Sequence, residues 1–311
     1  MKHRHYRRHV ENHRSKISHV ALLALFSFGM LLLTPSFIRY QQQFKKITNT
    51  KKVETATFDE RVFDGVQIEG KAFVVYDLKD RKVLAGKNET MELPLASLTK
   101  VMTAITAESI ASSTNERVTI SNENIDGGLD FGLRLGQKWA LDELLKYMLV
   151  FSSNDAARIV ATHFGGMPFF VKEMNEKAKS LTTTLVFTDP AGLDDDSTLG
   201  GRGTALDVVI LFREALRLFP DILDATTKTR FTASLDSGKV SGIPNTNQTV
   251  QDFPGMEGSK TGFTNLAGGN LAVVVDVTLG RPVVIVVLGS TREGRFKDVA
   301  LLYELLRKSV R

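Results

Sequence analysis

Two short apolar runs near the end of the chain constrain the fold more than any other feature of the sequence. The runs are residues 271–277 (LAVVVDV) and 283–288 (VVIVVL), and the tight-turn sequence 280–282 (GRP) separates them. Short runs rich in β-branched residues and bounded by Gly and Pro are typical of buried strands. A second hairpin is predicted far earlier, at 71–88. Because a two-stranded hairpin is only marginally stable by itself, we expect both pairs to join one antiparallel sheet.

Helical patterns fill most of the chain between the two strand pairs. They lie at 97–107, 142–150, 155–160, 169–180 and 204–218. A sheet built from both ends of the chain, with helices between them, predicts an α/β fold in which an antiparallel sheet is flanked by helices. We expect the middle of the chain, residues 113–254, to form an inserted all-helical lobe. The sheet-containing α/β lobe would then comprise residues 61–112 and 255–311.

The N-terminus combines a basic tail with an uncharged segment. Residues 1–16 are strongly basic, and residues 17–38 contain no acidic residue and no Lys or Arg. A run of about 20 such residues can span a bilayer, and its basic flank stays in the cytoplasm. We therefore expect a single-pass transmembrane helix that holds the protein at the cell membrane with its folded domain outside the cytoplasm. A cleaved signal peptide is the alternative and would leave a secreted protein. Residues 39–60 are predicted to be a polar stem.

Charge and composition exclude several classes of function. The formal net charge is +5, and residues 1–16 supply all of it, since they hold six basic residues and one acidic one. A nucleic-acid partner is therefore not expected, because the basic residues are not spread over the folded domain. The chain has no Cys, and of its six His only His163 lies in the body of the sequence. Thiolate chemistry is excluded, a zinc site or a Ser-His-Asp triad would depend on one His, and we expect neither metal nor cofactor.

A serine and a lysine three residues apart begin the first helical pattern. Ser97 and Lys100 would lie on one face of that helix, with the hydroxyl within reach of the amine. This is a nucleophile beside a possible base. The motif alone is weak, because a chain of this length holds about one Ser-x-x-Lys by chance. Taken alone, the stretch is better explained as a helix N-cap followed by a solvated Lys.

Two further motifs follow Ser97 and Lys100 in order. Ser152 and Asn154 lie at the corner between two predicted helices, and the tripeptide 260–262 (KTG) comes just before the late strands. Ser-x-x-Lys, Ser-x-Asn and Lys-Thr-Gly together are typical of β-lactamases and penicillin-binding proteins. The similarity extends beyond these motifs, to residues 95–103, 148–157, 255–268 and 284–296. The chain resembles the D-alanyl-D-alanine carboxypeptidases, the low-molecular-weight penicillin-binding proteins, over about residues 61–311, and this implies a β-lactamase/D,D-peptidase-like fold.

The resemblance implies a role for each residue that carries it. Ser97 would be the acylated nucleophile and Lys100 the base that takes its proton. Ser152 would relay that proton to the leaving amine, while Asn154 orients Lys100 and the substrate amide. Lys260, on the facing strand, would act as a second cation that attracts the substrate's terminal carboxylate.

Four further positions are implied to bind the substrate. Thr261 would offer a hydroxyl to the carboxylate, and Gly262 would let the substrate backbone approach the strand. The backbone N–H groups of Ser97 and Phe263 would hold the oxyanion. Arg295 matches the arginine that binds the carboxylate in the family.

The proposed base is useful only as a neutral amine. A free Lys has a pKa near ~10.4, so the site must favour the neutral form by about three units, or ~4 kcal/mol, at pH 7. Burial beside another cation has this effect. We expect Lys260 to be the main influence on the pKa of Lys100.

The sequence departs from the family pattern at three places. Ser153 replaces a usual Gly and is expected to crowd the helix corner slightly, and Ser259 stands where an apolar residue is usual. Neither an all-β domain nor an amphipathic anchor follows before Arg311, so membrane attachment is expected from the N-terminus.

The expected function is that of a serine-type D,D-carboxypeptidase in cell-wall synthesis and cell shape. It would remove the terminal D-alanine from peptidoglycan stem peptides, and β-lactam antibiotics would inhibit it as covalent acylating agents. A D,D-endopeptidase acting on peptidoglycan cross-links would use the same residues. A β-lactamase is less favoured because no Glu-x-x-x-Asn element follows the middle motif, and a non-catalytic penicillin-binding sensor is less favoured because the tail is short.

Overall fold

Strands from the two ends of the chain pair in one antiparallel sheet, as the sequence predicts. The computed structural model describes residues 56–113, 115–123, 129–195 and 198–311, and residues 56–311 form one compact unit. The strand order is β10-β11-β12-β1-β2. These strands span Met256–Thr264 (β10), Gly268–Asp276 (β11), Pro282–Ser290 (β12), Ala72–Asp77 (β1) and Lys82–Lys87 (β2). The late and early hairpins meet where β12 pairs with β1, from Leu288 opposite Ala72 to Val283 opposite Asp77.

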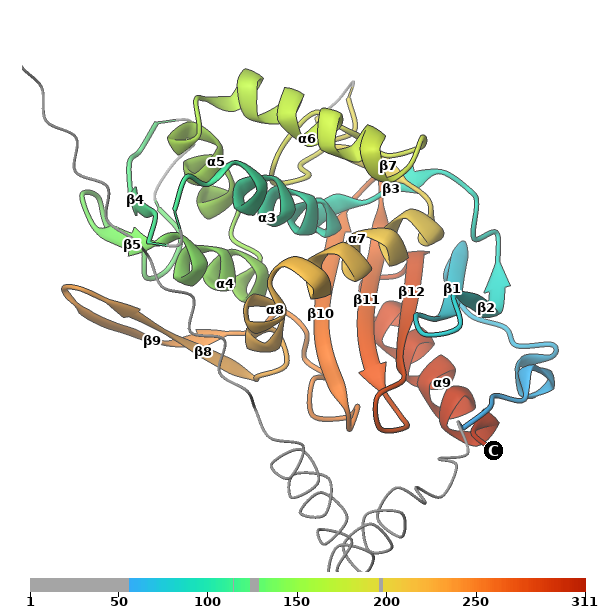
Figure 1. Ribbon diagram of the computed structural model, residues 1–311. Helices are drawn as coiled ribbons and strands as arrows, with labels where there is room; N and C mark the ends of the chain where they lie inside the picture. The colour runs from blue at the N-terminus through green and yellow to red at the C-terminus, as the bar shows by residue number, and fades with distance from the viewer. Residues whose placement is uncertain (1–55, 114, 124–128, 196–197) are drawn as a thin grey trace, which may run out of the picture. The chain divides into compact units, whose positions relative to one another are not determined.

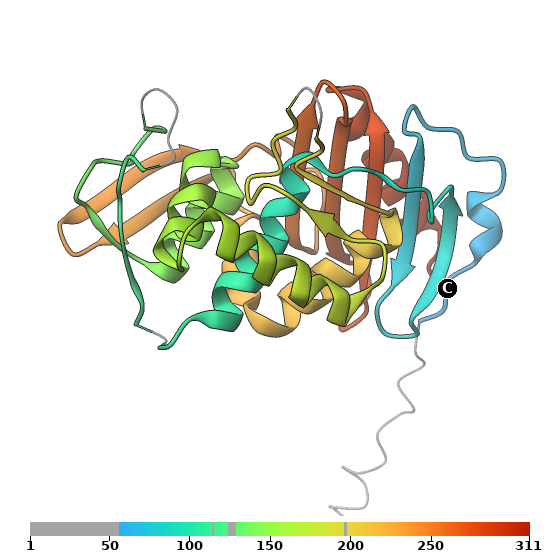
Figure 2. The same ribbon diagram turned by 90° about the horizontal axis from the view of Figure 1, so that it is seen from above.

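Helices cover both faces of this sheet, which explains why its central strands contain continuous apolar runs. Helix α9 (Gly294–Ser309) packs on one face, where Phe73 and Val75 are buried with Val299 and Leu302. The alternate residues of β1, including Val74, point to the other face, which α7 (Ala205–Leu218) covers. Figures 1 and 2 show α7 and α9 on opposite sides of the strands. Both faces of every central strand are therefore withdrawn from water.

The predicted helices are confirmed, and the first of them lies at the centre of the others. They are α3 (Thr99–Ile110), α4 (Leu141–Phe151), α5 (Asn154–His163), α6 (Met167–Leu181) and α7. A short further helix, α8 (Pro220–Ala225), was not predicted. Every residue of α3 from Thr99 to Ala107 is buried, and the helix is packed against α4, α5, α6 and α7. Helix α7 begins at the predicted capping box, in which Thr204 and Asp207 exchange hydrogen bonds. The rigid setting of α3 matters because it follows Ser97 directly.

The fold class is confirmed, but "all-helical" is too narrow a description of residues 113–254. This region also contains the hairpin of β8 (Arg230–Leu235) and β9 (Gly238–Pro244), which projects from the body in Figure 1. Two smaller sheets join β4 (Arg117–Thr119) to β5 (Lys138–Ala140), and β3 (Leu93–Pro94) to β7 (Gly201–Gly203) and β6 (Val186–Phe187). Most residues of β8 and β9 are exposed or half-buried, so these strands lack the apolar run that indicated the central ones.

The start of the described chain is bonded to its end. The backbone at 57–59 forms hydrogen bonds with residues 309–311 at the end of α9, and a short 3-10 helix, η1 (Glu60–Phe63), follows residue 59. The last residues of the predicted stem, 56–60, are thus already part of the folded unit. The basic tail (1–16), the predicted membrane anchor (17–38) and the stem up to residue 55 lie outside the described residues.

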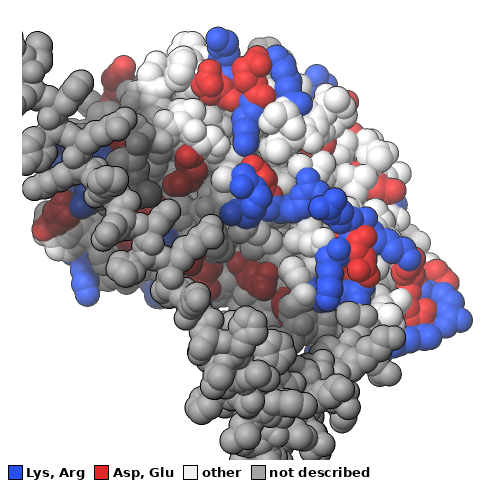
Figure 3. Space-filling view, in the orientation of Figure 1, with Lys and Arg blue, Asp and Glu red and all other residues white. Residues whose placement is uncertain are grey.

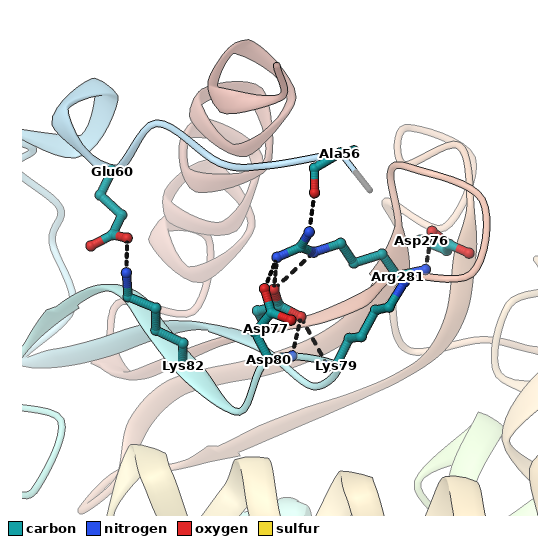
Figure 4. A network of polar contacts seen from close by, with 8 residues as sticks. All are labelled: Ala56, Glu60, Asp77, Lys79, Asp80, Lys82, Asp276 and Arg281. Carbon is teal, nitrogen blue, oxygen red and sulfur yellow. Dashed lines mark hydrogen bonds and ion pairs between the residues drawn. The ribbon is translucent and has the colours of Figure 1, made fainter. Parts of the chain in front are cut away.

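A buried arginine attaches this entry segment to two turns of the sheet. Arg281 donates to Asp77 Oδ2 from Nε and Nη2, at 2.9 and 2.6 Å, and also pairs with Asp80. Its third nitrogen donates to the carbonyl of Ala56, and its guanidinium lies 4.7 Å from the centre of the Phe58 ring. Figure 4 shows Arg281 with Ala56, Asp77 and Asp80, which converge on it from two other segments of the chain.

The distribution of surface charge and the length of the helices are relevant to the expected nucleic-acid and membrane interactions. In the view of Figure 3, basic and acidic side chains are interspersed over the described surface. Across the described ranges, no helix has both the length and the apolar character that a membrane crossing requires.

Candidate active site

Ser97 lies at a sharp entry into the central helix. It is in the 3-10 turn η2 (Ala96–Leu98), which leads directly into α3. Ala96 has φ +48°, a backbone conformation that costs an L-residue free energy and is common at functional sites. The side chains of Leu95, Ala96 and Leu98 are completely buried, whereas Ser97 is half-buried. The turn therefore fixes a hydroxyl at the surface of an otherwise closed core.

The amine of Lys100 is surrounded by three oxygen atoms. Its Nζ lies 2.9 Å from Ser97 Oγ, 2.8 Å from Asn154 Oδ1 and 2.7 Å from the carbonyl oxygen of Ala191. The side chain has no exposed surface. Burial lowers its pKa to about 7, against the opposing effect of Asp189. The amine is therefore poised to accept a proton from Ser97 near neutral pH.

The carbonyl of Ala191 was not predicted from the sequence. It belongs to a turn in which Asp189 Oδ1 accepts the backbone N–H groups of Ala191 and Leu193, at 2.8 and 3.2 Å. Thr103 on α3 donates to the carbonyl of Pro190 at 2.6 Å. A backbone oxygen carries no side-chain signal, so only the Asp-Pro turn sequence could have pointed to it.

The predicted corner between two helices is present and places two side chains at the site. Helix α4 ends at Phe151, Ser152 takes the left-handed conformation with φ +62°, and α5 begins at Asn154. Asn154 reaches Lys100, and the Ser152 hydroxyl accepts a hydrogen bond of 2.8 Å from Lys260 Nζ. The corner thus contacts both lysines.

Lys260 enters from the edge strand β10 and is almost completely buried. Its Nζ also donates to the carbonyl of Thr261, at 2.9 Å. Its pKa falls well below the ordinary value, first because of burial and then because of the charges of Lys100 and Arg295. For Lys100 the largest cause is likewise burial, and Arg158 is the cation that adds to the lowering. The expectation that Lys260 is the main influence on the pKa of Lys100 is therefore wrong. The close packing around α3 buries the amine, and this burial is the largest cause of its lowered pKa.

The predicted substrate-binding positions follow Lys260 along β10, beside Ser97. Thr261 Oγ1 is 2.8 Å from the hydroxyl of Thr246. A Cβ at Gly262 would come within 2.9 Å of the carbonyl of Leu95 and 3.3 Å of the Ser97 nitrogen. Only Gly allows the strand to run this close to the nucleophile. Phe263 comes next on the strand and is half-buried.

Arg295, at the start of α9, is packed behind β10. Its Nη1 donates to the carbonyl of Gly262 at 2.6 Å, and its side chain is almost fully buried. Burial and the neighbouring Arg292 lower its pKa to about 10. In this structure Arg295 braces the strand, and its predicted contact with a substrate carboxylate stays a prediction.

The two unusual serines both have hydrogen-bond partners. Ser153 caps α5 by accepting the N–H of Ala156 at 2.9 Å, and the expected crowding of the corner stays a prediction. The backbone N–H of Ser259 donates to Thr226 Oγ1 at 2.8 Å, and its hydroxyl donates to the Thr226 carbonyl at 3.2 Å.

Metal-ligating side chains are not gathered in the part of the chain that the structure describes. No group of three or more His, Asp or Glu there could hold a metal ion. His163 lies 3.0 Å from the carboxylate of Glu116, at the end of α5.

Comparisons with known proteins agree with this arrangement. Residues 54–292 match the family described as D-alanyl-D-alanine carboxypeptidase. The chain is 30% identical to D-alanyl-D-alanine carboxypeptidase DacB2 of Mycobacterium tuberculosis over 240 residues, 76% of each protein. It is 30% identical to the D-alanyl-D-alanine endopeptidase of Escherichia coli over 273 residues, 86% of this chain and 82% of the relative. The structure superposes on ampicillin-bound penicillin-binding protein D2 of Listeria monocytogenes with a TM-score of 0.68 and 29% identity, covering 78% of this chain and 98% of that one.

Proposed function

The chain belongs to the D-alanyl-D-alanine carboxypeptidase family, and we propose that Ser97 is the nucleophile with which it removes the terminal D-alanine from peptidoglycan stem peptides. The protein is a serine-type D,D-peptidase. The assignment of its site depends on one observation above all. The amine of Lys100 is fully buried, has a pKa of about 7 and lies 2.9 Å from the hydroxyl of Ser97.

Acylation begins when Lys100 takes the proton of Ser97. The Ser97 oxygen attacks the carbonyl carbon of the penultimate D-alanine, and the N–H groups of Ser97 and Phe263 stabilise the oxyanion. The peptide C–N bond then breaks, and a proton passes through the Ser152 hydroxyl to the leaving nitrogen. Free D-alanine departs, and the shortened peptide stays esterified to Ser97.

In deacylation, water is the nucleophile and Lys100 again acts as the base. Lys100 takes a proton from the water molecule as its oxygen attacks the ester carbonyl. The ester bond to Ser97 breaks, and the proton on Lys100 returns to the serine oxygen. The products are a stem peptide shortened by one residue and the free enzyme.

Recognition of the terminal carboxylate falls to the residues of β10. Burial lowers the pKa of Lys260 in the free site, and the charges of Lys100 and Arg295 add to this effect. An incoming carboxylate acts in the opposite direction, because a nearby negative charge favours the protonated amine. Thr261 adds a hydroxyl beside it, and Arg295 keeps the strand in place through the carbonyl of Gly262.

Penicillin labelling tests the assignment of the nucleophile. β-Lactams are expected to acylate Ser97, and penicillin-binding protein D2 of Listeria monocytogenes has been solved with ampicillin and with cefotaxime bound. The full chain should form a covalent adduct with fluorescent penicillin, and Ser97→Ala should form none. An unlabelled wild type, or a labelled Ser97→Ala variant, would overturn the proposal. Rapid hydrolysis of nitrocefin would favour a β-lactamase, and labelling without release of D-alanine would favour a non-catalytic binding protein.

Endopeptidase action on cross-links is a second candidate. Relatives named D-alanyl-D-alanine endopeptidase are 30–32% identical to the chain in Escherichia coli, Pseudomonas aeruginosa and Haemophilus influenzae. The same residues would cleave the D-alanyl bond of a cross-link. Mass spectrometry of purified muropeptides separates the two activities. Free D-alanine indicates a carboxypeptidase, and conversion of dimers to monomers indicates an endopeptidase.

Attachment to the cell membrane through residues 17–38 completes the proposal. The segment is uncharged, long enough to span a bilayer and preceded by a basic tail. The full chain should sediment with membranes at its full mass, and a variant without residues 1–38 should not. A mature protein that begins after residue 38 would show a cleaved signal peptide instead.

A further inference from the structure

The helix corner of the active site is held from outside by a carboxylate with no role assigned so far. Asp130, in the loop before β5, accepts a hydrogen bond of 2.6 Å from Ser153 Oγ, and its backbone N–H donates to Asp155 Oδ2 at 2.8 Å. The hydroxyl of Tyr147 on α4 donates to the carbonyl of Phe131 at 2.7 Å. We propose that Asp130 is a positioning residue for the peptidase reaction, which acts through Ser153 to hold Ser152 and Asn154 in place. The inference rests on the proposed function of Ser97.

The corner needs such a support because its backbone is unfavourable. Ser152 has φ +62°, a conformation that costs a non-Gly residue free energy. It persists only where the surrounding structure maintains it. A small rotation there would move Ser152 away from Lys260 and Asn154 away from Lys100, two contacts of 2.8 Å.

Ser153 uses both hydrogen-bonding functions of its hydroxyl at the corner. The oxygen accepts the N–H of Ala156 in the first turn of α5, and the proton is donated to Asp130. The side chain is almost completely buried, so water does not compete for either bond. A glycine, which the family pattern favours at this position, could make neither contact. Ser153 therefore ties the corner to a neighbouring loop.

Asp130 also contributes charge to the environment of Lys100. The charged groups that affect the pKa of Lys100 are Asp189, Asp130 and Arg158, and Lys260 faces it from β10. The two carboxylates favour the protonated amine and oppose the effect of burial. Asp130 thus has two separable effects, a hydrogen bond that fixes the corner and a charge that raises the pKa of Lys100.

Three variants separate these two effects. Asp130→Asn keeps an oxygen acceptor for Ser153 but removes the charge. Ser153→Ala keeps the charge but removes the tether, and Asp130→Ala removes both. Asp224→Asn is the matched control, since it removes an equally negative but exposed carboxylate from α8. The measurement is the acylation rate constant of the full chain with fluorescent penicillin between about pH 5 and 9.

The inference makes a different prediction for each variant. Ser153→Ala should lower the acylation rate on the high-pH plateau about tenfold, with the acid-side midpoint unchanged, because a buried hydrogen bond is lost. Asp130→Asn should keep the plateau rate and shift the midpoint to lower pH. Asp130→Ala should lower the plateau rate and also shift the midpoint to lower pH. Asp224→Asn should match the wild type.

Two results would overturn the inference while leaving the proposed function intact. One is a wild-type rate per folded molecule in Ser153→Ala, with only the melting temperature lowered. The other is a wild-type plateau rate per folded molecule in Asp130→Ala. An unmoved midpoint in Asp130→Asn would overturn only the charge effect on Lys100. A wild type that penicillin does not label would overturn the proposed function and this inference together.

Discussion

The amine of Lys260 lies 2.8 Å from the hydroxyl of Ser152, although the two residues are 108 positions apart in the chain. This contact joins the edge strand β10 to the end of α4. A second contact, from Lys100 to Asn154, joins α3 to the same corner. The corner therefore contacts both the proposed base, Lys100, and the lysine proposed to bind the carboxylate, Lys260.

Removal of the Lys260 amine should impair catalysis strongly. Lys260→Met keeps a long unbranched side chain but leaves Ser152 without its donor and the substrate carboxylate without its cation. Hydrogen bonds to charged groups contribute about 1.5–3 kcal/mol, so kcat/KM for D-alanine release should fall about ten- to hundredfold. Lys228→Met, which changes an exposed lysine, is the control and should keep full activity. Equal activity in both variants would contradict the assignment.

The acylation rate should depend on pH through the state of Lys100. Burial lowers its pKa to about 7, so the amine is protonated and unable to act as a base below that pH. The rate should rise about tenfold per pH unit on the acid side and level off above about pH 7 to 8. A pH-independent acylation rate would exclude Lys100 as the base.

The stability of the fold should also depend on the protonation of Lys100. The unfolded chain binds this proton more tightly than the folded chain does, so the folded state becomes relatively more stable as the pH rises. The contribution of Lys100 to the free energy of unfolding should therefore rise between about pH 7 and the ordinary lysine pKa of 10.5.

The parts of the site that were predictable from the sequence are those that depend on side chains within one local pattern. Ser97 and Lys100 are brought together by three residues of a helix entry, and the tripeptide at 260–262 is fixed by its strand. Burial of Lys100 could also have been foreseen, because residues 99–107 are apolar or small on every side, which is typical of a central helix.

The parts that were missed depend on the packing of distant segments. The Ala191 carbonyl is a backbone group, and its place beside Lys100 is decided by a turn at 189–192 that has no helical or strand period. Asp130 lies in a polar loop whose contact with Ser153 exists only after the chain has folded. The β8–β9 hairpin was missed although Phe231, Ala233 and Leu235 alternate with polar residues in β8, because both strands are largely solvated and lack a continuous apolar run.

A methyl group at Gly192 should disrupt the turn that presents the Ala191 carbonyl to Lys100. Gly192 has φ +73°, and a Cβ there would lie 2.1 Å from the carbonyl oxygen of Ala96. Gly192→Ala should lower both the free energy of unfolding and the acylation rate. Gly280→Ala is the matched control, because Gly280 has φ +78° but no atom within 4 Å of the new Cβ.

The difference between the free energies of unfolding of these two variants measures the steric overlap separately from the backbone strain. Both should lose about 1–2 kcal/mol from the left-handed conformation. Gly192→Ala should lose about 1–3 kcal/mol more, because it forces atoms into a packed region. Urea denaturation measures both values. If the two variants are equally stable and equally active, the turn at Gly192 does not position the nucleophile.

Arg281 should stabilise the folded unit without affecting the chemistry. Asp77 has no exposed surface, so Arg281→Ala would leave its carboxylate buried without a cation, at a cost of about 3–5 kcal/mol. A second change, Asp77→Asn, should recover part of the lost stability because it removes the unpaired charge. Arg61→Ala breaks a solvent-exposed pair with Asp59 and should leave the melting temperature nearly unchanged. The rate of penicillin labelling per folded molecule should match the wild type in all of these variants, since none of the changed residues contacts Ser97 or Lys100. A loss of labelling rate in Arg281→Ala at temperatures where it remains folded would instead show that the entry segment at Ala56 influences the catalytic corner.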